Sequence, residues 1–223
     1  MSPEKLKESI SNTTIQKVER SGKEVEFIFS NNNSLLVHLM LNGGFSIVNN
    51  SQNIKFKILT LNFSAGNSLV ISDPKCLVML NLNPVPGKVP DALEISAEYL
   101  KEKIQEKSRT LVKTFLLDQK IAKGIGNAYA DEILWQAKIS PLSKVGKLPD
   151  KAINDLLNSI SNVLLNAIEE IKKINPDIIS GEIREFLSVH NFSRKKSPTG
   201  HKIIKEQIAS KTTYYTDEQI LYE

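Results

Sequence analysis

The sequence is poor in the residues that build disulfides and metal sites. Its 223 residues include one cysteine, Cys76, and three histidines, which excludes a disulfide within one chain and a zinc site made of cysteines. No apolar run approaches the ~20 residues that span a bilayer, and residues 1–5, MSPEK, lack the apolar stretch of a secretion signal. We therefore expect no metal, no cofactor, no membrane partner and a reducing, cytoplasmic location.

Positive charge is modest overall and concentrated near the C-terminal end. The formal net charge is +4, with a pI of about 9.0. Residues 194–211 hold six lysines and arginines against a single acidic residue, Glu206. Such a concentration indicates a polyanion partner, and a solvated charged tail is the alternative.

The first 82 residues have the pattern of short antiparallel strands. Apolar residues alternate at Val25, Phe27 and Phe29, as expected for strands with one buried face. Further strand-like runs, separated by Asn- and Gly-rich turns, cover residues 35–41, 58–63, 69–72 and 77–82. This spacing predicts a β-sandwich.

The second half has a helical pattern. Residues 84–90 contain three of the nine prolines, which indicates a linker. We expect helices at 96–107, at 110–117, after Asn127, from a cap at Asp150, and from about Gly181 to Val189. A hairpin with strands at 202–204 and 212–216 should follow. The fold class is therefore α+β, an antiparallel sandwich followed by helices.

The segment 117–141 joins two amphipathic helical patterns through the turn Gly124-Ile125-Gly126-Asn127. Both glycines allow a positive φ and a close backbone approach, and Asn127 is placed to cap the second helix. The start of a helix offers unpaired N–H groups and a partial positive charge. The turn therefore predicts a phosphate-binding site.

These residues form the string D-Q-x-x-x-x-G-I-G-N-x-Y-A-D-E-I-L-W, from Asp118 to Trp135. It resembles the helix–two-turns–helix signature of the formamidopyrimidine-DNA glycosylase and endonuclease VIII family. The resemblance continues at residues 18–23 (VERSGK), 38–43, 73–74, 90–93, 198–200 and 213–215. Ribosomal proteins also hold RNA with such a turn, so an RNA-binding protein is the third interpretation below.

The resemblance implies a DNA-repair protein whose partner is double-stranded DNA with an oxidised purine or an abasic nucleotide, in a bacterial nucleoid. Contacts to DNA phosphates are implied at Lys23, His38, Gly126, Asn127 and Lys211, where Lys211 stands for a finger arginine. Family enzymes fill the gap left by the everted base with a methionine, an arginine and a phenylalanine. The matching positions are Leu41, Lys75 and Leu77.

The resemblance also implies three domains: a sandwich at 1–89, a helix–two-turns–helix domain at 90–190 and a finger hairpin at 191–223. The family finger holds zinc through four cysteines, whereas this chain has Ser197, Thr199, Thr216 and Gln219. We expect a zincless hairpin held by packing. His190 and His201 are expected to make hydrogen bonds rather than bind a metal.

Family enzymes open with Pro-Glu-Leu-Pro-Glu, in which the proline amine attacks the sugar. Here Pro3 follows Ser2, so its nitrogen is acylated and cannot form an iminium. The match begins several tens of residues into the family pattern, so the family's first strand and helix are expected to be missing. A second copy of the chain, as a homodimer, is then expected to cover the apolar strand surface.

Three interpretations of function follow. The first is a glycosylase and AP lyase of impaired activity, whose amine lies elsewhere or is Lys23. The second is a non-catalytic protein that clamps damaged DNA. The third is an RNA binder, which the strand-rich first half and the finger disfavour.

Overall fold

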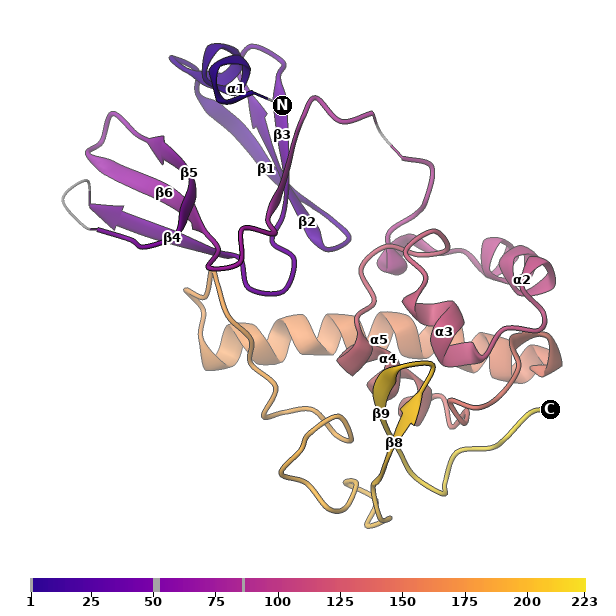
Figure 1. The fold of residues 1–223 in the computed structure, drawn as a ribbon. Coiled ribbons are helices and arrows are strands. Elements are labelled where there is room, and N and C mark those ends of the chain that lie inside the picture. Colours follow the sequence, from indigo (N-terminus) through magenta and orange to yellow (C-terminus); the bar gives the residue numbers. More distant parts are fainter. Residues whose placement is uncertain (1, 50–52, 86) are drawn as a thin grey trace. The chain divides into compact units, whose positions relative to one another are not determined.

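The computed structural model describes residues 2–49, 53–85 and 87–223, which divide into two compact units (Figure 1). The first unit comprises residues 1–87 and 177–182, and the second comprises 88–176 and 183–223. Within the described residues, no helix is both long enough and apolar enough to cross a bilayer.

The first unit is a sandwich of two antiparallel sheets. One has the order β1-β2-β3-β7 and the other the order β4-β6-β5. The strands are β1 (Ile15–Ser21), β2 (Glu24–Phe29), β3 (Ser34–His38), β4 (Gly44–Asn49), β5 (Lys57–Asn62), β6 (Asn67–Ser72) and β7 (Met79–Leu82). The alternation predicted from the sequence is confirmed at β2, where Phe27 pairs with Leu35 of β3 and both side chains are buried.

A short helix, α1 (Pro3–Ile10), opens the chain and was not predicted from the sequence. Ser2 caps it by accepting a hydrogen bond from the Lys5 N–H, and Pro3 occupies the first turn, where its missing N–H costs nothing. Leu6 and Ile10 are buried in the sandwich core. The helix therefore covers part of the strand surface that was expected to lie open.

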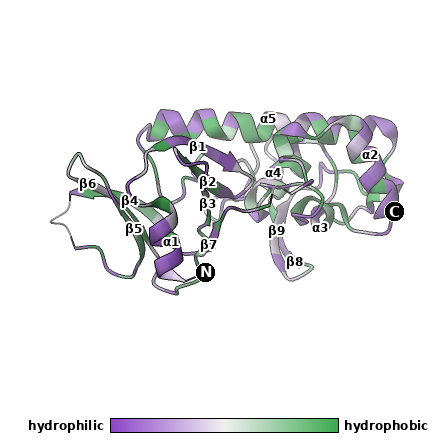
Figure 2. Cartoon of the chain, turned by 90° about the horizontal axis from the view of Figure 1, so that it is seen from above, coloured by the Kyte–Doolittle hydropathy of each residue, from purple (hydrophilic) through white to green (hydrophobic). Residues whose placement is uncertain are grey.

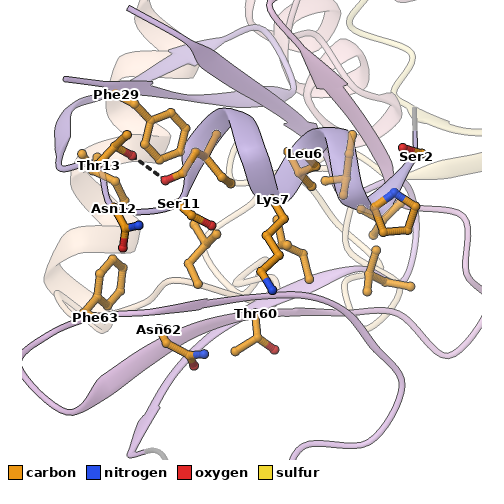
Figure 3. A pocket seen from close by; sticks show the side chains of 18 residues that line it. Ser2, Leu6, Lys7, Ser11, Asn12, Thr13, Phe29, Thr60, Asn62 and Phe63 are labelled. Atoms are coloured by element: carbon orange, nitrogen blue, oxygen red, sulfur yellow. Dashed lines mark hydrogen bonds between the residues drawn. The ribbon is translucent and has the colours of Figure 1, made fainter. Parts of the chain in front are cut away.

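A groove of about 720 Å³ remains between α1 and β5. Leu6 and Lys7 face it from the helix, and Thr60 and Asn62 face it from the strand (Figure 3). Among the described residues, β5 pairs with β6 alone, so its other edge borders this groove.

The second unit is built on helices α2 (Ala97–Glu106), α3 (Val112–Leu117), α4 (Asn127–Gln136) and α5 (Asp150–Ile174), with two 3-10 turns, Ala92–Glu94 and Val145–Lys147. Helix α5 is amphipathic, as its alternating colours in Figure 2 show, and Leu156 and Ile160 are fully buried. Helix α4 is buried on most of its surface, which includes Asp131 and Glu132. It is therefore the central helix of this unit.

Two local predictions in the helical unit are wrong. Asp150 is the first residue of α5 rather than its cap, and it pairs with Lys101 of α2 at 2.8 Å. Residues 181–189 form turns instead of a helix. The reason is that the N–H groups of residues 188–190 donate to the buried Glu132 carboxylate at 2.7–2.8 Å, so they cannot join a helical ladder.

The C-terminal hairpin consists of β8 (Ile204–Ile208) and β9 (Lys211–Tyr215). The predicted hairpin is confirmed, but its first strand lies further along the chain than the expected 202–204. Ala209 and Ser210 both have positive φ values, 47° and 62°. Two-residue hairpin turns with positive φ at both residues match the right-handed twist of the strands that they join. Thr213 and Tyr214 are buried, and β9 packs against α4.

The carboxylate of Glu218 joins three of the residues that stand where the family has its zinc-binding cysteines. Its Oε2 accepts hydrogen bonds from Thr199 at 2.7 Å, from Thr216 at 3.1 Å and from Ser197 at 3.3 Å. Further donors are the Trp135 indole at 3.2 Å and Lys138 at 2.8 Å. A hydrogen-bond network therefore acts besides packing at the base of this hairpin.

The fourth position, Gln219, bonds to the backbone of Thr216 and of Ile139 instead. Among the described residues, no cluster of three or more His, Cys, Asp or Glu could hold a metal ion.

The Glu218 network predicts acid-sensitive stability. Burial alone would raise the pKa of Glu218, but donors led by Lys138 and Thr199 lower it from 4.5 to about 2. Because the native pKa lies below the unfolded value, the stabilisation is complete above pH 4.5 and is lost as the pH falls toward 2. Glu218→Gln should unfold more easily at neutral pH and lose less stability on acidification, as measured by denaturant unfolding at several pH values.

The matched control is Glu169→Gln, which removes an exposed carboxylate from α5. It should retain the wild-type pH profile. A Glu218→Gln profile that parallels the wild type down to pH 2 would contradict the role of this carboxylate.

Candidate nucleic-acid interface

The side chain of Gln119 shapes the turn between α3 and α4. Its Nε2 donates to the carbonyls of Leu117 and Ile125, both at 3.0 Å, and its Oε1 accepts from the N–H of Gly124 at 3.0 Å. One side chain thus satisfies three backbone groups of an irregular segment. The N–H groups that begin α4 are held in place by this arrangement.

The two glycines of the turn differ in conformation. Gly124 has a φ of 109°, which is the left-handed region that favours glycine. Gly126 has a φ of −107°, so it does not use the positive φ that glycine allows, and it is the N-cap residue of α4. Since Gly126 has no side chain, nothing covers the first N–H groups of the helix from that position.

Asn127 does not cap α4, which corrects the sequence prediction. It is the first residue inside the helix, and its Nδ2 donates to the carbonyl oxygen of Thr212 in β9 at 2.8 Å. Its Oδ1 is buried and has no hydrogen-bond partner among the described residues. The side chain therefore joins the turn to the hairpin.

A buried ion pair holds the same three elements together. Lys113 of α3 and Asp131 of α4 lie 2.7 Å apart, and both side chains are at most 2% exposed. The Lys113 ammonium also donates to the Thr213 hydroxyl at 2.7 Å and to the Thr212 carbonyl at 3.1 Å. The second Asp131 oxygen accepts from the N–H of Tyr214 at 2.9 Å. Strand β9 is thereby fixed against the two helices.

Burial is the main influence on Lys113 and lowers its pKa, although Asp131 acts in the opposite direction. The positive charge of Lys211 contributes a further lowering. His190 Nδ1 lies 2.7 Å from Asp131 Oδ2, and the exposed His201 lies 2.7 Å from Asp217. Both histidines have carboxylate partners, as expected of hydrogen-bonding residues.

Lys211 is exposed at the start of β9, one residue before Thr212. Because Thr212 accepts from both Asn127 and Lys113, the hairpin brings Lys211 to the same side of the fold as the turn. The structure thus joins three of the predicted residues, Gly126, Asn127 and Lys211, within the second unit.

In the first unit, His38 ends β3 and holds the turn that follows. Its Nδ1 accepts the N–H of Met40 at 2.9 Å. The predicted strand over 35–41 therefore ends at residue 38, and Leu41 stands on the turn with 85% of its surface exposed. A Cβ added to Gly43 would lie 2.5 Å from Val78 Cγ2, so this turn packs closely against the loop before β7.

That second loop is organised by the buried carboxylate of Asp73. It accepts the N–H groups of Lys75 at 2.8 Å, Leu77 at 2.6 Å and Val78 at 3.1 Å. Burial alone would raise the pKa of Asp73, but these three donors together hold it below its ordinary value. The loop presents Lys75 and Leu77 as exposed side chains.

The candidate residues of the first unit therefore lie on neighbouring loops, with one exception. Leu41 and Leu77 stand on loops that touch through Gly43 and Val78, whereas Lys23 is exposed in the separate turn between β1 and β2.

Sequence reasoning missed three residues that position the others: Gln119, Lys113 and Asp73. Gln119 and Asp73 belong to recognisable strings, which was a usable signal. Lys113 occupies a helix position that reads as an ordinary surface lysine, since only the fold reveals its burial.

Comparison with known proteins assigns both halves of the chain. The formamidopyrimidine-DNA glycosylase N-terminal domain matches residues 1–80, and the formamidopyrimidine-DNA glycosylase H2TH domain matches residues 87–177. A formamidopyrimidine-DNA glycosylase of Rickettsia bellii is 30% identical over 94% of this chain and 83% of its own length. One from Mycoplasma mobile is 27% identical over 96% and 84%.

Solved structures agree. An Fpg of Lactococcus lactis in complex with DNA containing an abasic site has a TM-score of 0.84 and 25% identity. The match covers 97% of this chain and 86% of that one. MutM in complex with DNA containing carbocyclic 8-oxo-G has a TM-score of 0.83 and 25% identity, with the same coverage.

The buried ion pair predicts a large effect of a single substitution. Lys113→Met should lower the free energy of unfolding by about 3–5 kcal/mol, because it leaves Asp131 charged and buried without a lysine partner. Denaturant unfolding monitored by circular dichroism measures this. Lys151→Met is the matched control, since its partner Asp155 is 2.7 Å away and the lysine is 87% exposed. The control should cost at most about 1 kcal/mol, and equal losses in the two variants would contradict the assignment.

Proposed function

The chain belongs to the formamidopyrimidine-DNA glycosylase family, and from that premise we propose that it binds duplex DNA at a damaged or abasic nucleotide. It is a DNA-repair protein of this type. The observation that supports the proposal is the network through Thr212, the residue after Lys211, whose carbonyl accepts from Asn127 at the start of α4 and from Lys113.

The second unit supplies the grip on phosphate. The start of α4 offers N–H groups and the positive end of a helix dipole, with only glycine at the N-cap. Lys211 adds an exposed cation next to them. As a lysine it provides charge without the two-pronged geometry of arginine, so its contact with phosphate is weaker and less directional.

The first unit supplies contacts at the lesion. Leu41 is the most exposed apolar side chain of its loop, and Leu77 and Lys75 stand on the adjoining loop. Apolar side chains inserted between base pairs occupy the space of a base that has left the stack. His38 serves by holding the Leu41 turn, and Lys23 contributes a cation to the backbone contacts.

Strand cleavage by the family reaction needs an amine that attacks the sugar. In this polypeptide the Pro3 nitrogen is an amide and cannot serve as that amine. Lys23 is the alternative amine, but a lysine ammonium must lose its proton before it can act as a nucleophile. We therefore propose that the 223-residue chain recognises damaged DNA and nicks it slowly or not at all.

Binding can be tested by fluorescence anisotropy with a duplex that carries one tetrahydrofuran abasic analogue. Affinity should fall with salt, with a log–log slope of about −0.9 for each neutralised phosphate. Lys211→Ala should weaken binding and reduce the slope by about one such increment. Lys172→Ala, on the exposed side of α5, is the control and should leave both unchanged. A salt-independent affinity would contradict phosphate-centred binding.

The same assay decides between the DNA and RNA interpretations. Equal or tighter binding to a stem-loop RNA of the same length would favour the RNA binder.

Catalysis is tested by borohydride trapping on a duplex with a natural abasic site. We expect little covalent adduct with the 223-residue polypeptide, because its Pro3 nitrogen is an amide and cannot form an iminium. Lys23→Ala should change the small yield only if Lys23 is the amine, and Lys55→Ala, another exposed lysine, is the control. Adduct formation at the rate of a working lyase would overturn the proposal of impaired activity and leave the binding proposal intact.

The location of the protein and its oligomeric state are part of the same proposal. A cytoplasmic setting agrees with Cys76, which is an exposed free thiol. A homodimer would cover the groove between α1 and β5, and the mass of the chain in solution would show whether it forms.

A further inference from the structure

Met40 has a backbone conformation that its side chain disfavours. Its φ is 56°, in the left-handed region, where residues other than glycine and asparagine are uncommon. The surroundings impose this conformation, because the Met40 N–H is bonded to His38 Nδ1 at 2.9 Å. The turn is then closed by the Gly43 N–H, which donates to the Leu39 carbonyl at 3.0 Å.

The strained residue also exposes its side chain. Met40 is 43% exposed and the next residue, Leu41, is 85% exposed. A single exposed apolar residue is ordinary, but here two large ones follow each other on a turn that is held rigidly. Backbone strain and apolar exposure both cost folding free energy. Such features are found at binding sites, so the turn is a candidate for contact with a ligand.

The turn has a fixed support. A Cβ added to Gly43 would lie 2.5 Å from Val78 Cγ2 of the neighbouring loop and 2.4 Å from the Leu39 carbonyl oxygen of its own turn. That loop is itself held by Asp73 through the N–H groups of Leu77 and Val78. The exposed pair therefore stands on a backbone that cannot retreat easily.

We propose that Met40 is a specificity-determining residue that acts with Leu41 as a two-residue apolar wedge for duplexes that lack a base. The inference rests on the proposed function. An unbranched thioether chain has several rotatable bonds and fills irregular gaps, which suits a vacancy in a base stack. Insertion is easiest where no base has to be displaced, because unstacking an intact pair costs free energy. Met40 thus raises the preference for the abasic duplex over an intact one.

The test compares three variants on two duplexes. Met40→Asn removes the apolar chain but tolerates the left-handed backbone, so the turn is retained. Met40→Leu keeps an apolar chain of similar size. Ile47→Asn is the control, since it removes another exposed apolar side chain, on strand β4, outside both loops. Each variant is titrated with a duplex that holds one tetrahydrofuran abasic analogue and with the same duplex intact.

We expect Met40→Asn to weaken binding to the abasic duplex about tenfold and to change binding to the intact duplex less than about twofold. Met40→Leu should restore most of the preference, and Ile47→Asn should match the wild type. The thermal stability of Met40→Asn should equal or exceed that of the wild type, since strain is relieved.

A second readout is 2-aminopurine placed opposite the abasic analogue. Its fluorescence should rise when the wild-type chain binds, because the wedge disturbs its stacking, and should rise less with Met40→Asn.

Equal loss on both duplexes, or an unchanged preference, would overturn the role of Met40 and leave the proposed function standing. Failure of the wild-type chain to bind either duplex would overturn both.

Discussion

The buried ion pair between Lys113 and Asp131 is the constraint on which the second unit's candidate interface depends. An unpaired charge in this position would be strongly unfavourable, so α3 and α4 must keep the two groups together. The same ammonium bonds to Thr212 and Thr213 of the hairpin, which therefore cannot shift without breaking a charged contact. Lys211, the residue before Thr212, is positioned through the same network. The proposed contacts with phosphate therefore depend on a buried ion pair.

Elsewhere in the chain, single polar side chains organise irregular backbone in the same way. Asp73 satisfies three N–H groups of the loop before β7, and Glu132 satisfies three in the segment at 188–190. Gln119 does so for the turn before α4, and Glu218 joins the hydroxyls at the base of the hairpin. Loops that carry function can be rigid when their polar groups have partners.

Much of the regular structure could be predicted because it depends on periodicity. The alternation at Phe27 and Phe29 and the apolar stripe of α5 both follow from burying one face. Helix α1 was missed because it is short and mostly polar, and only Leu6 and Ile10 enter the core. The helix expected at 181–189 does not form because Glu132, 56 and 57 residues earlier in the chain, accepts the backbone N–H groups of Ser188 and Val189.

The family resemblance, the glycine-bounded turn and the cations near the C-terminal end could be predicted from residue type and spacing alone. The role of Asn127 could not be predicted, because its partner Thr212 lies 85 residues away. The left-handed backbone of Met40 and the burial of Lys113 are likewise visible only in the folded chain. Local patterns report which face of an element is apolar, whereas contacts between distant residues depend on how the elements pack.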